Sequence, residues 1–175
     1  MNRQCTVCGS TAFLARDEDK CLKCLTSNRK KGDFFVGIDP DVKESGFALY
    51  NPIDRIFEEI DSFSFFKLYD VLQCYIGIIS LVRIEAGWLN TKSNFHNKPG
   101  QSKESGERIA NYVGANAETG RKIVEMCDYL KLPYELVKPL CTKSIDSKLF
   151  NKITGYTKRT NQDQRDAAML VWDYK

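Results

Sequence analysis

Short apolar runs alternate with polar turns from residue 33 onward and predict a succession of strands and helices. The runs with strand character are Asp33–Asp39, Gly46–Tyr50, Arg55–Phe65, Ile78–Glu85 and Tyr134–Val137. The stretches with helical spacing are Phe66–Ile76, Ser105–Leu130, a short segment near Ile145–Ile153, and Asp163–Tyr174. This order predicts an α/β domain over residues 33–175, with a mixed sheet flanked by helices.

Two of the predicted strands end in an acidic residue. Asp39 closes the first apolar run, and Glu85 closes the fourth. If those strands are neighbours, both carboxylates lie at one edge of the sheet, beyond the carboxyl ends of its strands, where ligands collect. Asp163 and Asp166 are three residues apart at the start of the last helix, so they share one face of that helix.

Each of these acids also has an ordinary structural interpretation. Asp39 precedes Pro40 and could be a turn residue, while Glu85 could be an exposed residue at a strand end. Asp163 could cap the last helix, and Asp166 could be a favourable charge near its N-terminus. Together, however, the four carboxylates favour a metal site, because they offer the hard oxygen ligands that suit Mg²⁺ or Mn²⁺. Two such ions, about 3.5–4 Å apart, can activate water and stabilise the leaving oxygen in phosphodiester hydrolysis.

The start of the chain contains two pairs of cysteines. Cys5 and Cys8 form one CxxC pair, Cys21 and Cys24 form the other, and twelve residues separate the pairs. Four thiolates at two tight corners suit a closed tetrahedral zinc site, which is structural because no position stays open. Disulfides are the alternative. Residues 1–32 therefore predict a zinc-stabilised module, similar to zinc ribbons or knuckles, with a basic linker.

Charge and composition restrict the class of partner. The net charge is +3, but residues 1–32 carry seven Lys/Arg against three Asp/Glu. A second basic stretch, residues 138–159, has six Lys/Arg against a single acid, Asp146. Such patches favour a polyanionic partner, with an ordinary solvated surface as the alternative. The sequence contains no run of 18 or more apolar residues, so no membrane-spanning helix is predicted. Seven cysteines without an apolar signal segment indicate a reducing, cytoplasmic location.

The motifs together resemble the RuvC family of Holliday-junction resolvases, over roughly residues 34–174. VGIDPDVKESGFAL resembles the family's opening strand and hairpin, with Asp39 in the place of its first metal ligand. RIEAGW resembles its second acidic strand, with Glu85 as ligand. DQRDAAMLVW resembles its closing helix, with Asp163 and Asp166 as the last two ligands. The resemblance implies an RNase H-like fold and a metal-dependent nuclease.

The resemblance implies further DNA contacts. Trp88, three residues after Glu85, holds the place of an aromatic that probes the junction centre, although it could instead pack under the loop. Pro139 and Lys143 match a proline and a basic residue four positions later, so Lys143 would stabilise charge on the phosphate in the transition state. The basic stretch adds three more expected DNA-binding residues, Lys148, Lys158 and Arg159.

The chain departs from the family's common bacterial pattern in its cysteine module and in the short segment from Lys143 to Asp163. Both departures resemble divergent phage-borne relatives. The sequence predicts a structure-selective endodeoxyribonuclease that cleaves branched DNA such as Holliday junctions, and the resemblance implies a homodimer. Alternatives are a less selective nuclease for other branched, single-stranded or RNA substrates, and a non-catalytic zinc-containing nucleic-acid-binding protein. The cysteine module could also bind a protein partner.

Other reactive or aromatic residues are given no functional role. His96 lies in a polar loop, and metal binding by it is not predicted. Cys74, Cys127 and Cys141 are isolated in the sequence and are expected to be small core residues. Four aromatic residues lie near the end of the third strand and in the following helix, and they are expected in the core rather than on a base-stacking surface. They are Phe63, Phe65, Phe66 and Tyr69.

Overall fold

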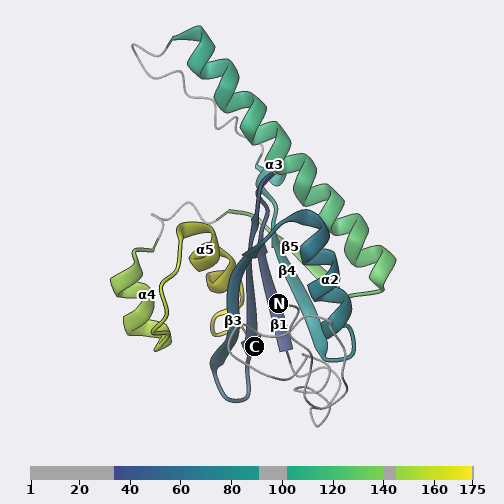
Figure 1. Ribbon diagram of the computed structural model, residues 1–175, viewed down its shortest axis with the longest axis vertical. Helices are drawn as coiled ribbons and strands as arrows, with labels where there is room; N and C mark the ends of the chain where they lie inside the picture. Colours follow the sequence, from purple (N-terminus) through teal and green to yellow (C-terminus); the bar gives the residue numbers. More distant parts are fainter. Residues whose placement is uncertain (1–33, 91–101, 140–144, 175) are drawn as a thin grey trace, which may run out of the picture.

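A computed structural model describes residues 34–90, 102–139 and 145–174 (Figure 1). The strands are β1 Phe34–Asp39, β2 Ser45–Asn51, β3 Ile56–Phe63, β4 Ile79–Glu85 and β5 Tyr134–Val137. The helices are α2 Phe65–Tyr75, the 3-10 helix η1 Gly87–Leu89, α3 Lys103–Leu130, α4 Ser147–Thr154 and α5 Gln162–Val171. The strands and helices predicted for these residues are present, with boundaries that differ by a few residues.

The five strands form one mixed sheet in the order β3-β2-β1-β4-β5. β2 is antiparallel to both β1 and β3, whereas β1, β4 and β5 run parallel to one another. The predicted α/β fold class, a mixed sheet flanked by helices, is thus confirmed for the described residues. Because β1, β4 and β5 are parallel, their last residues meet at one edge of the sheet, which we call the carboxyl edge.

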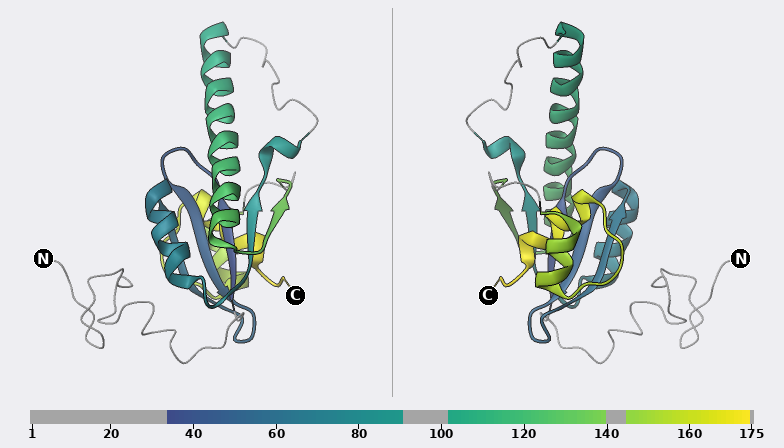
Figure 2. Two further views of the ribbon diagram at one scale, coloured as in Figure 1. Left: turned by 90° about the vertical axis from the view of Figure 1, so that its right-hand side faces the viewer. Right: turned by 90° about the vertical axis from the view of Figure 1, so that its left-hand side faces the viewer.

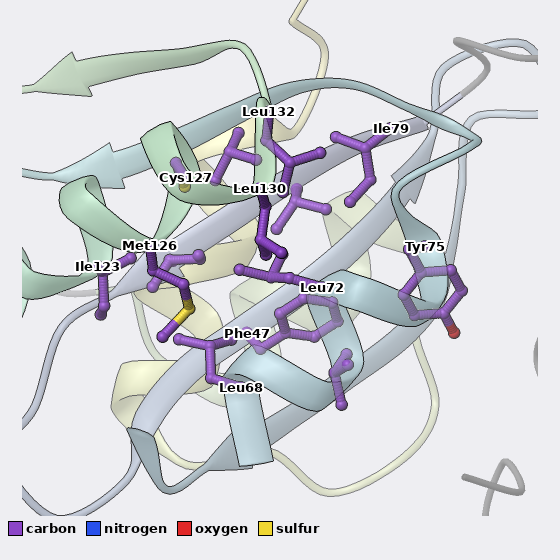
Figure 3. Packing of buried hydrophobic residues seen from close by; sticks show 14 of the residues in the cluster. Phe47, Leu68, Leu72, Tyr75, Ile79, Ile123, Met126, Cys127, Leu130 and Leu132 are labelled. Carbon is purple, nitrogen blue, oxygen red and sulfur yellow. The ribbon is translucent and has the colours of Figure 1, made fainter. Parts of the chain in front are cut away.

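One face of the sheet, the α2/α3 face, is covered by α2 and α3. Val36 and Ile38, two residues apart on β1, point to this face together with Phe47 of β2, and all three side chains are fully buried. Leu72 of α2 and Ile123 of α3 pack against this layer (Figure 3). The core of this face is mostly aliphatic, and each such side chain contributes about 1.5–3 kcal/mol on burial.

The opposite face, the α5/α4 face, is covered by α5 with α4 beside it (Figure 2). Its core is smaller and aromatic. The rings of Tyr50 and Phe57 both lie 5.6 Å from the ring of Trp172, and Phe150 of α4 is 6.2 Å from Phe57. Helix α5 was predicted to continue to Tyr174 but ends at Val171, because Trp172 leaves the helical conformation and packs into this cluster.

The predicted core positions of the aromatic residues around α2 are only partly correct. Phe63 is buried and Tyr69 packs against the core. Phe66, however, is 81% exposed and Phe65 is 36% exposed, so the core prediction is wrong for these two. Helix α2 buries the side that carries Leu68, and Phe66 lies about 200° around the helix from it.

The isolated cysteines within the described residues occupy core positions, as predicted. Cys127 is fully buried, and Cys74 is partly buried against the same cluster of the α2/α3 face. The predictions for Cys141 and His96 lie outside the described residues. Neither described cysteine requires a functional role.

Helix α3 is much longer than the sheet face that it covers. Its 28 residues span about 42 Å. The C-terminal half buries Ile123 and Cys127, whereas the N-terminal half projects beyond the carboxyl edge (Figure 1) and leaves Ile109 and Tyr112 about half exposed. None of the described helices is both long and apolar enough to cross a membrane.

Candidate functional site

Strand pairing brings two of the predicted acids together at the carboxyl edge. Ile38 of β1 pairs with Ile84 of β4, so Asp39 and Glu85, which follow them, end on adjacent strands. Neighbouring strands lie about 4.8 Å apart, within the range of direct electrostatic interaction. Side chains alternate between faces along a strand, and Gly37 faces α5, so Asp39 points to the α5/α4 face as well.

Two glycines allow α5 to lie directly against the strands. A methyl group at Gly37 would overlap the carbonyl oxygen of Ala167, and one at Gly46 would overlap the carbonyl oxygen of Asp163. The start of α5 therefore lies over β1 and β2 at a distance that no larger residue permits. This close approach places Asp163, in the first turn of α5, beside Asp39.

The start of α5 is fixed by its own hydrogen bonds. Asn161 forms a capping box, in which its side chain accepts from the backbone N–H of Gln164 at 2.8 Å and its own N–H donates to the Gln164 side chain at 2.9 Å. The Asn161 amide also donates to Ser62 Oγ of β3 at 3.2 Å. Asn161 is thus the helix cap, and Asp163 is left free of the capping role considered for it from sequence.

The electrostatics shows that the four predicted acids form one group. Burial, followed by the charges of Glu85, Asp163 and Asp166, raises the pKa of Asp39 to about 8. Burial also raises the pKa of Glu85, with the charge of Asp166 adding to the effect. Each acid thus makes ionisation of its neighbours less favourable.

The two acids of α5 also have raised pKa values. Burial raises the pKa of Asp163, followed by the charges of Asp41 and Asp166, whereas Arg165 acts in the opposite direction. Burial raises the pKa of Asp166 as well, against a hydrogen bond from Gln162 and the charge of Arg165. All four predicted acids are partly buried, and a cation among them would relieve their mutual repulsion.

The donor set fits a hard divalent cation, because partly buried carboxylate oxygens are the ligands that Mg²⁺ and Mn²⁺ prefer. Among the described residues, no three His, Cys, Asp or Glu side chains already converge as ligands of one ion. Asp166 provides one reason, because its Oδ1 accepts a hydrogen bond from Gln162 Nε2 at 2.7 Å. At least one carboxylate must therefore change rotamer to join the others around an ion.

Arg165 organises the site and was not predicted from the sequence. It is 9% exposed, and its guanidinium donates to the carbonyl oxygens of Ile145 at 3.0 Å and Thr160 at 2.8 Å. It also donates to Gln162 Oε1 at 2.7 Å. Arg165 therefore ties the segment before α5 to the helix itself. The available signal was an arginine on the buried side of a helix, between two acids.

Asp41 is a second residue of the site that was given no functional role from the sequence. It lies between β1 and β2, and its negative charge contributes to the raised pKa of Asp39 and of Asp163. A fifth carboxylate thus belongs to the electrostatic environment of the site. The spacing Asp39-Pro40-Asp41 gave no indication of this, because the electrostatic interaction with Asp163 depends on where α5 lies.

Trp88 lies in η1, directly after β4. Its ring packs so closely against α3 that a methyl group at Gly120 would overlap it, and Arg121 lies 5.6 Å from the ring centroid. Trp88 is partly buried against the core of the α2/α3 face. The structure therefore gives Trp88 a packing role next to the site, and DNA contact by Trp88 remains a prediction.

The predicted basic residues divide into two groups. Lys148 on α4 and both Lys158 and Arg159, between α4 and α5, have exposed side chains. Lys143 lies outside the described residues. The same holds for the four predicted zinc ligands, Cys5, Cys8, Cys21 and Cys24.

No protein-family model matches the chain, and no curated protein matches it. Similar solved structures include Thermus thermophilus RuvC in complex with a Holliday junction substrate, which is 12% identical, with coverage of 79% of this chain and 89% of that chain and a TM-score of 0.49. A second Thermus thermophilus RuvC structure is 11% identical, with coverages of 78% and 92% and a TM-score of 0.44. The yeast mitochondrial Holliday junction resolvase Ydc2 is 9% identical, with coverages of 90% and 85% and a TM-score of 0.32.

Proposed function

We propose that this protein is a metal-dependent nuclease whose active site is the carboxylate group at the carboxyl edge. The observation that carries the proposal is the placement of four acids from two strands and a helix, Asp39, Glu85, Asp163 and Asp166. The charges of the other three raise the pKa of Asp39, and the charge of Asp166 raises the pKa of Glu85 and Asp163. A structural role does not explain why four mutually repelling carboxylates should be gathered and partly buried. Divalent cations explain the arrangement.

The residues of the site would hold two cations, with Asp39 as the shared ligand because it interacts with each of the other three acids. Bound cations would lower the pKa of a water molecule and stabilise the negative charge on the leaving oxygen of a phosphodiester. Asp39, with a pKa of about 8, must lose its proton before it can act as a ligand. The capping box fixes the backbone of the first turn of α5, which carries Asp163 and Asp166, while their side chains adjust to the ions.

We propose branched DNA, such as a Holliday junction, as the substrate. This part rests on the resemblance of the motifs around Asp39, Glu85 and the start of α5 to those of RuvC resolvases. The exposed basic residues Lys148, on α4, and Arg159, which precedes α5, would contact the phosphate backbone. Paired cleavage of a two-fold symmetric junction would require a homodimer. A zinc site in residues 1–32 stays a prediction from the cysteine spacing.

The test is cleavage of a labelled four-way DNA junction beside a matched linear duplex, with Mg²⁺, Mn²⁺ or EDTA. We expect metal-dependent paired cuts confined to the junction, which Asp39→Asn abolishes while DNA binding survives. Asp70→Asn, the same substitution at an exposed position of α2, is the control and should cleave normally.

Other outcomes separate the alternatives. Equal cutting of both DNA substrates would retain the nuclease and remove the junction preference. The same assay on single strands and RNA would then define the substrate class. Binding without cleavage under either metal would contradict the nuclease proposal and leave a nucleic-acid-binding protein.

A further inference from the structure

The turn between β1 and β2 is held by hydrogen bonds that centre on Asp41. Its carboxylate Oδ1 accepts from the backbone N–H of Lys43 at 2.8 Å, and its own backbone N–H donates to Ser45 Oγ at 3.2 Å. These bonds are local to the turn. They leave the second carboxylate oxygen of Asp41, Oδ2, for a partner from elsewhere in the fold.

That partner is Asn116, which is 75 residues away in the sequence and lies near the middle of α3. The Asn116 amide nitrogen donates to Asp41 Oδ2 at 3.1 Å. Its amide oxygen accepts from the backbone N–H of Val42, also at 3.1 Å. One side chain of α3 thus uses both ends of its amide to hold the turn that follows β1.

The position of Asn116 is itself set by packing one helical turn further along α3. Gly120 lies against the ring of Trp88 and near the ring of Pro40, which is part of the same turn as Asp41. A side chain at Gly120 would overlap the Trp88 ring and crowd Pro40, so glycine permits the close approach of α3 to the turn. Asn116 and Gly120 share one face of α3, so this close packing brings the amide to the turn.

We propose that Asn116 is a positioning residue of the carboxylate site: it fixes Asp41 as a fifth negative charge beside Asp39 and Asp163, and thereby strengthens the binding of divalent cations. The inference rests on the proposed function of the site. It assigns α3, which supplies none of the four predicted ligands, an indirect part in cation binding. It also gives Asp41 a role through charge and orientation, while ligation stays with the four acids.

The electrostatic contacts support this arrangement. After burial, Asp41 is the largest cause of the raised pKa of Asp163, and it also contributes to the raised pKa of Asp39. The geometry agrees, because the backbone of Asp163 lies over Gly46 of β2, which pairs with Asp39. β2 lies on the side of β1 opposite to β4, the strand that ends in Glu85. Residues that orient the surroundings of a metal site typically change its affinity 10–100-fold when they are removed.

The experiment measures Mn²⁺ affinity in the full-length protein by titration calorimetry, with electron paramagnetic resonance of free Mn²⁺ as a check. Asn116→Ala removes both hydrogen bonds and should weaken binding by about tenfold or more. Asp41→Asn removes the charge but keeps an acceptor for the turn, and should weaken binding to a similar degree. Asn111→Ala, at an exposed position of the same helix, is the matched control and should bind as wild type.

The double variant Asp41→Asn/Asn116→Ala tests whether Asn116 acts through Asp41. If it does, the double variant binds Mn²⁺ no more weakly than Asp41→Asn alone, because the two losses are not additive. Losses that multiply, or an Asn116→Ala variant with wild-type affinity, would overturn the inference. Circular dichroism and Tm without Mn²⁺ check that each variant is folded, and a merely structural role would produce no such coupling.

Asp39→Asn separates this inference from the proposed function. If wild type binds Mn²⁺ and Asp39→Asn does not, the site is a cation site and the Asn116 variants decide the inference alone. If wild type and Asp39→Asn bind Mn²⁺ equally weakly, the proposed function fails and the role of Asn116 fails with it.

Discussion

The α2/α3 face and the α5/α4 face are built from the same strands, yet they bury different kinds of residues. The first is filled by aliphatic side chains such as Val36, Leu72 and Ile123. The second combines an aromatic cluster with glycine contacts under α5 and ends in carboxylates at the carboxyl edge. Because side chains alternate along a strand, β1 supplies Ile38 to one face and Asp39 to the other. One face can therefore stabilise the fold while the other carries groups that destabilise it.

Truncation in the α2/α3 face should have the largest effect on stability and none on the site. Leu72→Ala removes a fully buried side chain of α2, and we expect it to lower the free energy of unfolding by about 3 kcal/mol, from lost burial and a residual cavity. Urea denaturation measures the change. Mn²⁺ affinity of the folded variant should be unchanged, and a large loss would show that the two faces are not separable.

Gly37→Ala should damage both stability and the site, because the added methyl group meets the backbone of α5 at Ala167. We expect a loss of about 2–3 kcal/mol in urea denaturation and weaker Mn²⁺ binding as α5 shifts. Gly114→Ala makes the same change in an exposed turn of α3 with no atom nearby, and should stabilise the protein by about 0.5–1 kcal/mol. Equal effects at the two glycines would refute the close-packing explanation.

Because the pKa of Asp39, on the α5/α4 face, is raised, the free energy of unfolding of the protein should depend on pH. Its ordinary pKa is 3.8 and its folded value is about 8, so between these values the folded state holds a proton that the unfolded state has released. The free energy of unfolding of the cation-free protein should therefore fall as pH rises from 4 to 8.

Asp39→Asn removes this effect. Without cations, we expect its Tm at pH 8 to exceed that of wild type by roughly 2–4 °C. The difference should shrink toward pH 4, and saturating Mn²⁺ should reverse it by stabilising only wild type. A Tm difference that does not depend on pH would contradict the proposed burial and repulsion at Asp39.

The smallest expected effect concerns DNA affinity, which should depend on the α5/α4 side of the molecule. Lys148→Ala, at an exposed position of α4, should weaken binding a few-fold and reduce the slope of log K against log salt by about 1 if it contacts one phosphate. Lys122→Ala, on α3, removes the same charge from the other side and should leave the slope unchanged. Fluorescence anisotropy at several salt concentrations gives both values.

The sequence was sufficient to predict most of the described fold, whereas the metal-binding role of the four acids stays a prediction. Apolar runs bounded by turn residues located β1 and β4, and the acids at their ends identified the carboxyl edge. It was less informative where one residue could serve two elements. Phe65 was predicted at the end of the third strand and Phe66 at the start of the next helix, both in the core. Only the packing of α2 on the side of Leu68 decided that Phe66 is exposed.

What the sequence determined by itself is local: which segments form strands and helices, and which acids end them. The tertiary structure alone decided which residues join these acids. Asn116 reaches Asp41 across 75 residues, and Arg165 reaches Ile145 across 20, because the seating of α3 and α5 on the sheet brings them there. Periodicity and spacing report only the face of an element on which a residue lies. The partner across the gap depends on how closely two elements approach, and in this protein glycines at positions 37, 46 and 120 set that distance.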